Sequence, residues 1–167
     1  MNVNRMKLTK AISLAALALL FCSIRAPLAC ADDAIDEKIA EPVQNLFLAW
    51  ENLDHNQYMA QWAPGATQYD ERGHRRRDLH EISQRRSADF KKYRHVEMNY
   101  RILETKVTGE NTAEVRVEYF MNLMRQDGKE VHDGSESKPN QEVYLLVYDA
   151  NNQRWLITEN HDYLGRQ

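Results

Sequence analysis

Apolar residues in the first half of the chain recur every three or four positions, as on one side of an amphipathic helix. This spacing predicts a helix over residues 35–53 and another from Asp78 to Lys92. Between them, Asp54 and Gln57 are typical of an N-cap with a capping box, so we expect a short helix that ends at Pro64-Gly65. The apolar positions are Ile35, Ile39, Val43, Leu46, Phe47, Trp50 and Leu53, then Tyr58, Met59 and Trp62, and finally Leu79, Ile82, Phe90 and Tyr93, with Arg86 on the same side.

From residue 96 onward the apolar period changes to two, which is typical of strands with one buried face. The alternation predicts a hairpin over residues 96–123 with its loop at 108–111. It predicts a second hairpin over residues 142–161 with its loop at 149–152. Hairpins of this kind form antiparallel pairs, because a short loop reverses the direction of the chain.

The segments outside these elements are short and polar. We expect a brief strand at 66–69, polar turns at 70–73 and 126–129, and no strand in the polar segment 130–140. Helices followed by a meander of strands are typical of an α+β domain. The predicted architecture is a cone-shaped, curved antiparallel sheet wrapped around three N-terminal helices and open at one end.

The first 31 residues have the pattern of a secretory signal peptide. Basic residues precede an apolar run over 11–24, which is too short to span a bilayer because about 20 apolar residues are needed. Ala29 and Ala31 then form an A-x-A cleavage site. We therefore expect cleavage after Ala31, a single domain over 32–167, a periplasmic or secreted protein, and no stable membrane anchor. The alternative is a lipoprotein acylated at Cys30, although Pro27 stands where an aliphatic residue is expected.

Removal of this segment changes the composition of the working protein. Both cysteines, Cys22 and Cys30, would be lost, so the exported domain would depend on its apolar core rather than on a disulfide. The remaining chain holds 18 basic and 25 acidic residues, a formal charge of −7. Such a charge argues against nucleic acid as a partner. The six histidines show no metal-binding spacing, and no motif for a cofactor is present, so we expect neither a metal nor a cofactor.

Three segments carry a resemblance to a known fold family. They are Trp50-Glu51-Asn52-Leu53-Asp54, the run from Tyr58 to Thr67, and the closing Arg154-Trp155-Leu156-Ile157-Thr158-Glu159. In this order they resemble the nuclear transport factor 2-like, or SnoaL-like, superfamily with its cystatin-like cone. The spacing of Trp50, Asp54 and Tyr58 is similar to that of the accessory domain of periplasmic L,D-transpeptidases. The resemblance implies a fold rather than one activity, because this fold hosts enzymes, binding modules and dimerisation domains.

Asp70 is the candidate catalytic residue that the resemblance suggests. The segment from Ala66 to Gly73 is similar to the place where ketosteroid isomerases keep their general-base aspartate, and a carboxylate inside an apolar cone would have a raised pKa. Leu46, however, stands where those isomerases carry a tyrosine on a helix, so a donor for the developing oxyanion is missing. The alternative is that Asp70 opens a polar turn.

A set of aromatic residues with one acidic residue predicts a ligand pocket. Tyrosine and tryptophan offer polar tips to a ligand while they pack a core, although a simple core is the alternative interpretation. Asp54 is expected either at the mouth of the cone or only as a helix cap. The candidate pocket residues are Trp50, Asp54, Tyr58, Trp62, Tyr69, Tyr100, Tyr119 and Tyr144.

Positive charge gathers in one part of an otherwise acidic chain. Residues 72–95 hold nine lysines and arginines, which predicts a basic helix that binds an anionic cell-envelope component or a protein, or else a solvated helix face. Its named members are Arg75, Arg76, Arg77, Arg85, Arg86, Lys91 and Lys92.

The sequence therefore favours an exported, non-catalytic binding or accessory domain that uses the cone pocket or the basic helix. Its partner would be a small ligand, a cell-envelope component or a protein. The alternative is a small-molecule isomerase or lyase with Asp70 as general base. A homodimer is expected through the outer face of the sheet, because Phe120, Met124, Leu146 and Tyr148 leave that face apolar.

Overall fold

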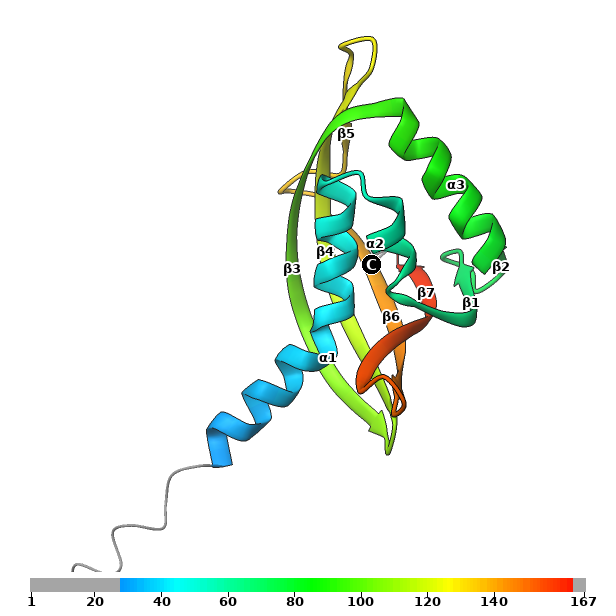
Figure 1. Ribbon diagram of the computed structural model, residues 1–167. Coiled ribbons are helices and arrows are strands. Elements are labelled where there is room, and N and C mark those ends of the chain that lie inside the picture. Colours follow the sequence, from blue (N-terminus) through cyan, green and yellow to red (C-terminus); the bar gives the residue numbers. More distant parts are fainter. Residues whose placement is uncertain (1–27, 164–167) are drawn as a thin grey trace, which may run out of the picture. The chain divides into compact units, whose positions relative to one another are not determined.

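The computed structural model describes residues 28–163 (Figure 1), with side chains from Ile35 to Asp162. The chain divides into two units, Met1–Ala34 and Ile35–Gln167, and all the strands belong to the second. The predicted signal peptide lies outside the described residues except for its last four, which belong to the first helix. Cleavage after Ala31 and acylation of Cys30 remain predictions. The helices are α1 Leu28–Glu51, α2 His55–Met59 and α3 Leu79–Lys92; the strands are β1 Trp62–Tyr69, β2 Arg75–Asp78, β3 Tyr93–Gly109, β4 Thr112–Arg125, β5 Glu130–Asp133, β6 Asn140–Asp149 and β7 Arg154–Tyr163.

The apolar stripe of α1 packs into the core, as its spacing predicts. Val43, Leu46 and Phe47 are buried, whereas Ile35 at the start of the stripe is 50% exposed. At the other end of the helix, Oε1 of Glu51 accepts a hydrogen bond from the backbone N–H of Met98 at 3.0 Å. This bond attaches the end of α1 to β3.

The second helix begins where predicted and ends earlier. Oδ1 of Asp54 accepts from the backbone N–H of Gln57 at 3.0 Å, so Asp54 is the N-cap. The N–H of Asp54 donates to Ala49 O instead of to the Gln57 side chain, so the capping box is incomplete. The prediction that the helix continues to Pro64-Gly65 is wrong, because Trp62 already pairs with β7 opposite Ile157 and starts β1. Tertiary pairing overrides the local signal here.

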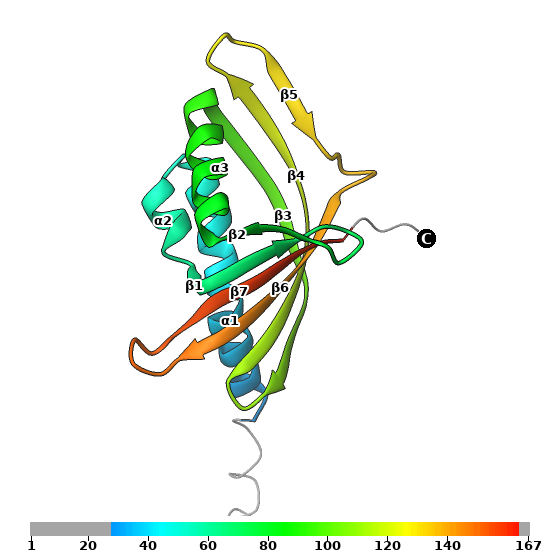
Figure 2. The same cartoon turned by 90° about the vertical axis from the view of Figure 1, so that its right-hand side faces the viewer.

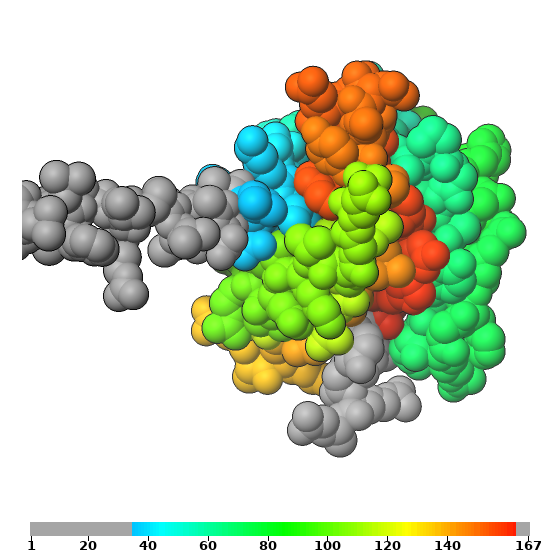
Figure 3. Space-filling model, turned by 90° about the horizontal axis from the view of Figure 1, so that it is seen from below, coloured from blue at the N-terminus to red at the C-terminus, as the bar shows by residue number. Residues whose placement is uncertain are grey.

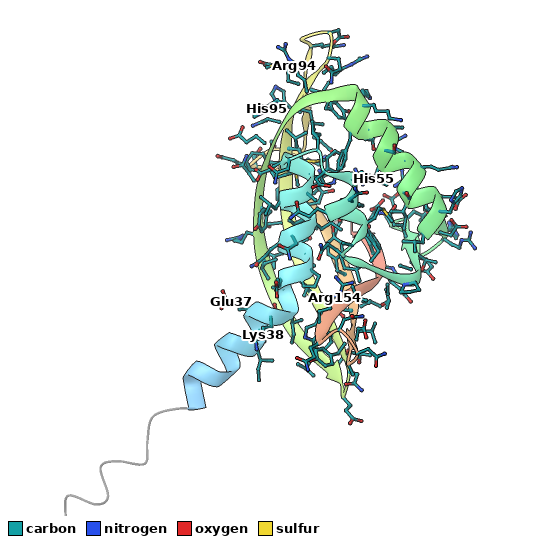
Figure 4. All side chains as sticks on the ribbon, in the orientation of Figure 1. Glu37, Lys38, His55, Arg94, His95 and Arg154 are labelled. Carbon is teal, nitrogen blue, oxygen red and sulfur yellow. The ribbon has the colours of Figure 1, made fainter. Side chains whose placement is uncertain are left out.

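The third helix matches its prediction closely. Asp78 is its N-cap, and Asp78 and Glu81 form a complete capping box. Ile82 and Phe90 are buried on the face that the spacing selects. Figure 4 shows His55 pointing from α2 toward α3, where its Nε2 lies 3.1 Å from both the carbonyl oxygen and the hydroxyl of Ser83.

The strands form one curved, open sheet in the order β2-β1-β7-β6-β4-β3, with β5 paired to β4. The helices lie on one face of this sheet (Figure 2), and the hairpin ends of β3–β4 and β6–β7 lie next to each other at one end (Figure 3). The α+β class and the curved sheet agree with the prediction. Two details differ from the prediction. The pair β1–β7 is parallel, and the polar segments at 75–78 and 130–133 form short strands.

The outer face of the sheet is less apolar than the sequence suggests. Leu146 is only 2% exposed and belongs to the core, so it does not contribute to that face. Phe120, Met124 and Tyr148 are partly exposed. The homodimer through this face remains a prediction.

Candidate ligand cavity

A cavity of about 400 Å³ lies between the helices and the concave side of the sheet. Residues of all three helices and of all seven strands line it. Pockets of this size hold small molecules in other proteins. Its lining includes Phe47, Trp50, Tyr58, Gln68, Arg76, Arg77, Arg85, Arg86, Asp89, Tyr119, Glu142, Tyr144, Asn160 and Asp162.

The carboxyl group of Glu142 is the centre of a cluster of hydrogen bonds in this cavity. Oε1 accepts from the Tyr119 hydroxyl at 2.7 Å, and Oε2 accepts from Nδ2 of Asn160 at 3.0 Å. The Tyr144 hydroxyl also donates to Oε2. Tyr119 comes from β4, Glu142 and Tyr144 from β6, and Asn160 from β7, so three strands in adjacent positions hold one carboxyl group.

Burial changes the ionisation of this cluster. It raises the pKa of Glu142 above its ordinary value, although the hydrogen bonds from Tyr144, Tyr119 and Asn160 act in the opposite direction. Burial, with the nearby Glu142 charge, also raises the pKa of Tyr119 and of Tyr144 well above the ordinary value. The Glu142 carboxyl therefore holds its proton to a higher pH than an exposed glutamate does, and both phenols stay protonated as donors.

A hydrogen-bonded chain leads from this carboxyl to the edge of the sheet. Asn160 is 1% exposed, and its Oδ1 accepts from Nε2 of Gln68 at 3.2 Å. Oε1 of Gln68 in turn accepts from Nη1 of Arg77 at 3.3 Å. Because each amide uses both its oxygen and its nitrogen, the chain fixes the orientation of both side chains between Arg77 and Glu142.

Aromatic rings surround the polar cluster. The Phe47 ring on α1 lies 5.5 Å from the Tyr119 ring and 6.4 Å from the Tyr144 ring, measured between centroids. A second aromatic group surrounds Arg86, whose guanidinium carbon lies 3.8 Å from the centroid of the Trp50 ring and 4.5 Å from that of Tyr58. The lining thus combines aromatic contact area with many polar and charged side chains.

Arg86 is part of this interior rather than of an exposed basic surface. Its side chain is 13% exposed; Nη2 donates to the Tyr58 hydroxyl at 3.1 Å, and Nη1 lies 3.6 Å from Oδ2 of Asp89. Burial raises the pKa of Tyr58, and the neighbouring Arg86 acts in the opposite direction. From the sequence, Arg86 counts among the cations of the basic surface but also lies on the apolar side of α3. The structure supports the second position, because the side chain is largely buried.

Four of the eight predicted pocket residues line the cavity: Trp50, Tyr58, Tyr119 and Tyr144. The other four do not. Asp54 caps α2, and Trp62 is buried in the core. Tyr69 stacks on His161 with ring centroids 4.6 Å apart, and Tyr100 is 41% exposed.

Asp70 lies in an exposed turn after β1 and is not among the lining residues. Its Oδ1 accepts from the backbone N–H groups of Arg72 and His74, both at 2.9 Å. The bond from His74 is the main reason that the pKa of Asp70 is lowered, which is opposite to the shift expected from the resemblance. Leu46 does line the cavity, but the hydroxyl donors there come from Tyr58, Tyr119 and Tyr144 instead.

The predicted basic helix is divided between two elements. Arg75, Arg76 and Arg77 lie on β2, whereas Arg85, Arg86, Lys91 and Lys92 lie on α3. Of these, Arg76, Arg77, Arg85 and Arg86 line the cavity. Arg75 pairs with Asp78 at 3.3 Å, and Nζ of Lys92 lies 5.1 Å from the Tyr93 ring.

Glu142, Asn160 and Gln68 are site residues that the sequence analysis missed. Glu142 shares its strand face with Tyr144 and Leu146, so a charged residue in an apolar register was the available signal. Gln68 and Asn160 carried no such signal, because their role depends on the pairing of β1 with β7.

Residues 35–162 contain no group of three or more side chains that could hold a metal ion. No helix in the described part of the chain is long and apolar enough to cross a membrane.

Comparison with known proteins identifies the fold. No family model and no curated protein matches the chain. A proposed scytalone dehydratase from Novosphingobium aromaticivorans superposes with a TM-score of 0.68 at 8% identity, covering 84% of this chain and 99% of that one. A nuclear transport factor 2-like superfamily protein from Salmonella enterica superposes with a TM-score of 0.64 at 15% identity, covering 81% of this chain and 94% of that one.

A ketosteroid isomerase-like protein from Erwinia carotovora atroseptica gives a TM-score of 0.62 at 16% identity, covering 79% of this chain and 97% of that one. The narrower resemblance to the L,D-transpeptidase accessory domain is not supported by these comparisons. Identities this low establish a shared architecture and not a shared activity. The chain therefore has the nuclear transport factor 2-like, or cystatin-like, fold.

Proposed function

We propose that the cavity binds a small molecule and that Glu142 is the polar group around which this molecule is positioned. The observation that supports this most strongly is a buried carboxyl group, held by three side-chain donors, in the wall of a cavity of about 400 Å³. From residues 1–31 alone we further propose that the domain acts after export, in the periplasm or outside the cell.

Benzamide is a suitable neutral probe, because its ring matches the aromatic lining and its amide offers both a donor and an acceptor. We expect benzamide to shift the NMR amide signals of cavity-lining residues in the wild-type protein. Glu142→Gln should weaken this binding about tenfold, which corresponds to the loss of about 1.4 kcal/mol in one polar contact. The matched control Asp70→Asn changes a partly exposed carboxyl outside the cavity and should leave the affinity unchanged.

Two results would contradict the proposal. One is the absence of shifts at the cavity lining up to the solubility limit of benzamide. The other is equal binding by the wild type and Glu142→Gln, which would mean that the carboxyl does not position the probe.

A second candidate function is proton transfer, with Glu142 rather than Asp70 as the base. A carboxyl group with a raised pKa accepts a carbon-bound proton more readily than an ordinary one, and the Tyr119 and Tyr144 phenols offer donors in the same cluster. Structures of the same fold include an isomerase-like protein and a proposed dehydratase. In such a step the proton moves to a carboxylate oxygen of Glu142, and the electron pair of the C–H bond forms an enolate.

Acetophenone in deuterated water tests this second function directly. If Glu142 is a base, the wild-type protein should accelerate deuterium uptake at the methyl group of acetophenone, measured by proton NMR. Typical general-base contributions are about 10²–10⁴-fold, so Glu142→Gln should lose most of the acceleration. Asp70→Asn should keep it. Loss in Asp70→Asn with retention in Glu142→Gln would restore the hypothesis that Asp70 is the base.

A further inference from the structure

Four arginines, two on β2 and two on α3, line one wall of the cavity, and two aspartates among the described residues form ion pairs with them. Nη1 of Arg76 lies 2.6 Å from Oδ2 of Asp162. Arg85 and Arg86 share Oδ2 of Asp89, at 3.1 Å from Arg85 Nε and 3.6 Å from Arg86 Nη1. Three guanidinium groups thus pair with two carboxylates, so positive charge exceeds paired negative charge among these side chains, while Glu71, Asp133 and Glu142 line other parts of the cavity.

Arg77 is the fourth arginine, and its surroundings differ. Its hydrogen-bond partner is the neutral amide oxygen of Gln68 at 3.3 Å, and it forms no ion pair with the residues that the structure describes. Desolvation and repulsion from Arg76 and Arg85 lower the pKa of Arg77, although the negative charge of Asp162 acts in the opposite direction. A half-buried cation in a positive environment gains free energy when a negative group binds beside it.

Resting on the function proposed above, we infer that the ligand of the cavity is a small organic acid whose carboxylate binds Arg77. A single unpaired guanidinium matches one negative charge, and its planar donors fit the two oxygens of a carboxylate. The Gln68–Asn160 chain holds Arg77 and Glu142 in a fixed relation, so the carboxylate binds at one end of the ligand and Glu142 meets its other polar group. Phe47, Tyr119 and Tyr144 contact the apolar part between them.

Benzoate and benzamide form a matched pair of probes, because they have nearly the same shape and differ in charge. In the wild type we expect benzoate to bind about tenfold or more tightly than benzamide, since a charge-assisted hydrogen bond contributes more than a neutral one. Arg77→Gln should reduce the affinity for benzoate about tenfold or more and that for benzamide much less, so that the preference for benzoate is lost. Affinities come from the NMR shifts of the cavity lining at low ionic strength.

Arg154→Gln is the control for a general change in charge. Arg154 is exposed at the start of β7, beside the β6–β7 hairpin (Figure 4), and is not a lining residue. This variant should bind both probes as the wild type does. Arg77→Lys keeps the charge but loses the planar fork, and it should retain part of the preference for benzoate.

The outcomes separate this inference from the proposed function. Equal affinity for the two probes in the wild type, or equal weakening of both by Arg77→Gln, would overturn the carboxylate inference while the cavity remains a binding site. Failure of both probes to shift the cavity lining would overturn both proposals. A thermal unfolding curve for Arg77→Gln identifies a folding defect, and in that case the comparison of the two probes in the wild type and in Arg77→Lys decides the result.

Discussion

Replacing Arg86 by alanine is expected to lower the free energy of unfolding by about 3 kcal/mol. The guanidinium stacks on two aromatic rings, which contributes about 1–2 kcal/mol in a desolvated position. Its hydrogen bond to Tyr58 and its ion pair with Asp89 contribute about 1 kcal/mol or more together. Urea denaturation followed by circular dichroism measures the change.

Arg85 provides the matched control for this prediction. It pairs with the same oxygen of Asp89, yet its side chain is 60% exposed, so Arg85→Ala should cost no more than about 0.5–1 kcal/mol. Arg86→Met keeps much of the buried volume, so its loss in free energy of unfolding should lie between those of Arg85→Ala and Arg86→Ala. Equal losses in Arg85→Ala and Arg86→Ala would show that Arg86 acts only as a surface charge.

Replacing Glu142 by leucine is expected to destabilise the fold most strongly in acid. The three donors of Tyr119, Tyr144 and Asn160 lose their acceptor, at about 1 kcal/mol each. We therefore expect Glu142→Leu to lower the free energy of unfolding by about 3 kcal/mol near pH 4, as measured by denaturant unfolding. The exposed Glu104 on β3 provides the control, and Glu104→Leu should change stability by no more than about 0.5 kcal/mol.

The difference between the wild type and Glu142→Leu should shrink as the pH rises. Burial raises the pKa of Glu142 in the folded chain, so the folded protein holds this proton to a higher pH than the unfolded chain does. The contribution of this pKa difference to the free energy of unfolding is fully present below the pKa of Glu142 in the unfolded chain, near 4.5. It is lost as the pH rises through the raised pKa of Glu142 in the folded chain. A difference that grows with pH would mean that the charged carboxylate is the form the fold prefers.

The helices and the long strands could be predicted because their apolar spacing and their caps depend on residues close in sequence. Capping by Asp54 and Asp78, the stripes of α1 and α3, and the alternation in β3 and β4 follow from contacts close in sequence. The strands β2 and β5 could not be found this way. They are four residues long and polar, and they exist because a neighbouring strand offers free backbone groups.

The site was only half predictable for a related reason. The aromatic residues Trp50, Tyr58, Tyr119 and Tyr144 stand out by type and spacing, and they do line the cavity. Glu142 was missed because its role as a hydrogen-bond acceptor depends on which strands lie beside β6. Arg86 was recognised as lying on the apolar side of α3, but its burial against Trp50 follows from tertiary packing alone.

The parallel pairing of β1 with β7 also determines when the cavity can exist. Thr67 and Gln68 lie opposite Glu159 and Asn160, so strands about ninety residues apart must meet before the wall between Arg77 and Glu142 is complete. Closing so long a loop precedes any gain from the contact and slows folding. A ribosome-bound chain, with β7 still out of reach, therefore lacks this part of the cavity. The cavity is complete only after β7 has emerged and paired with β1.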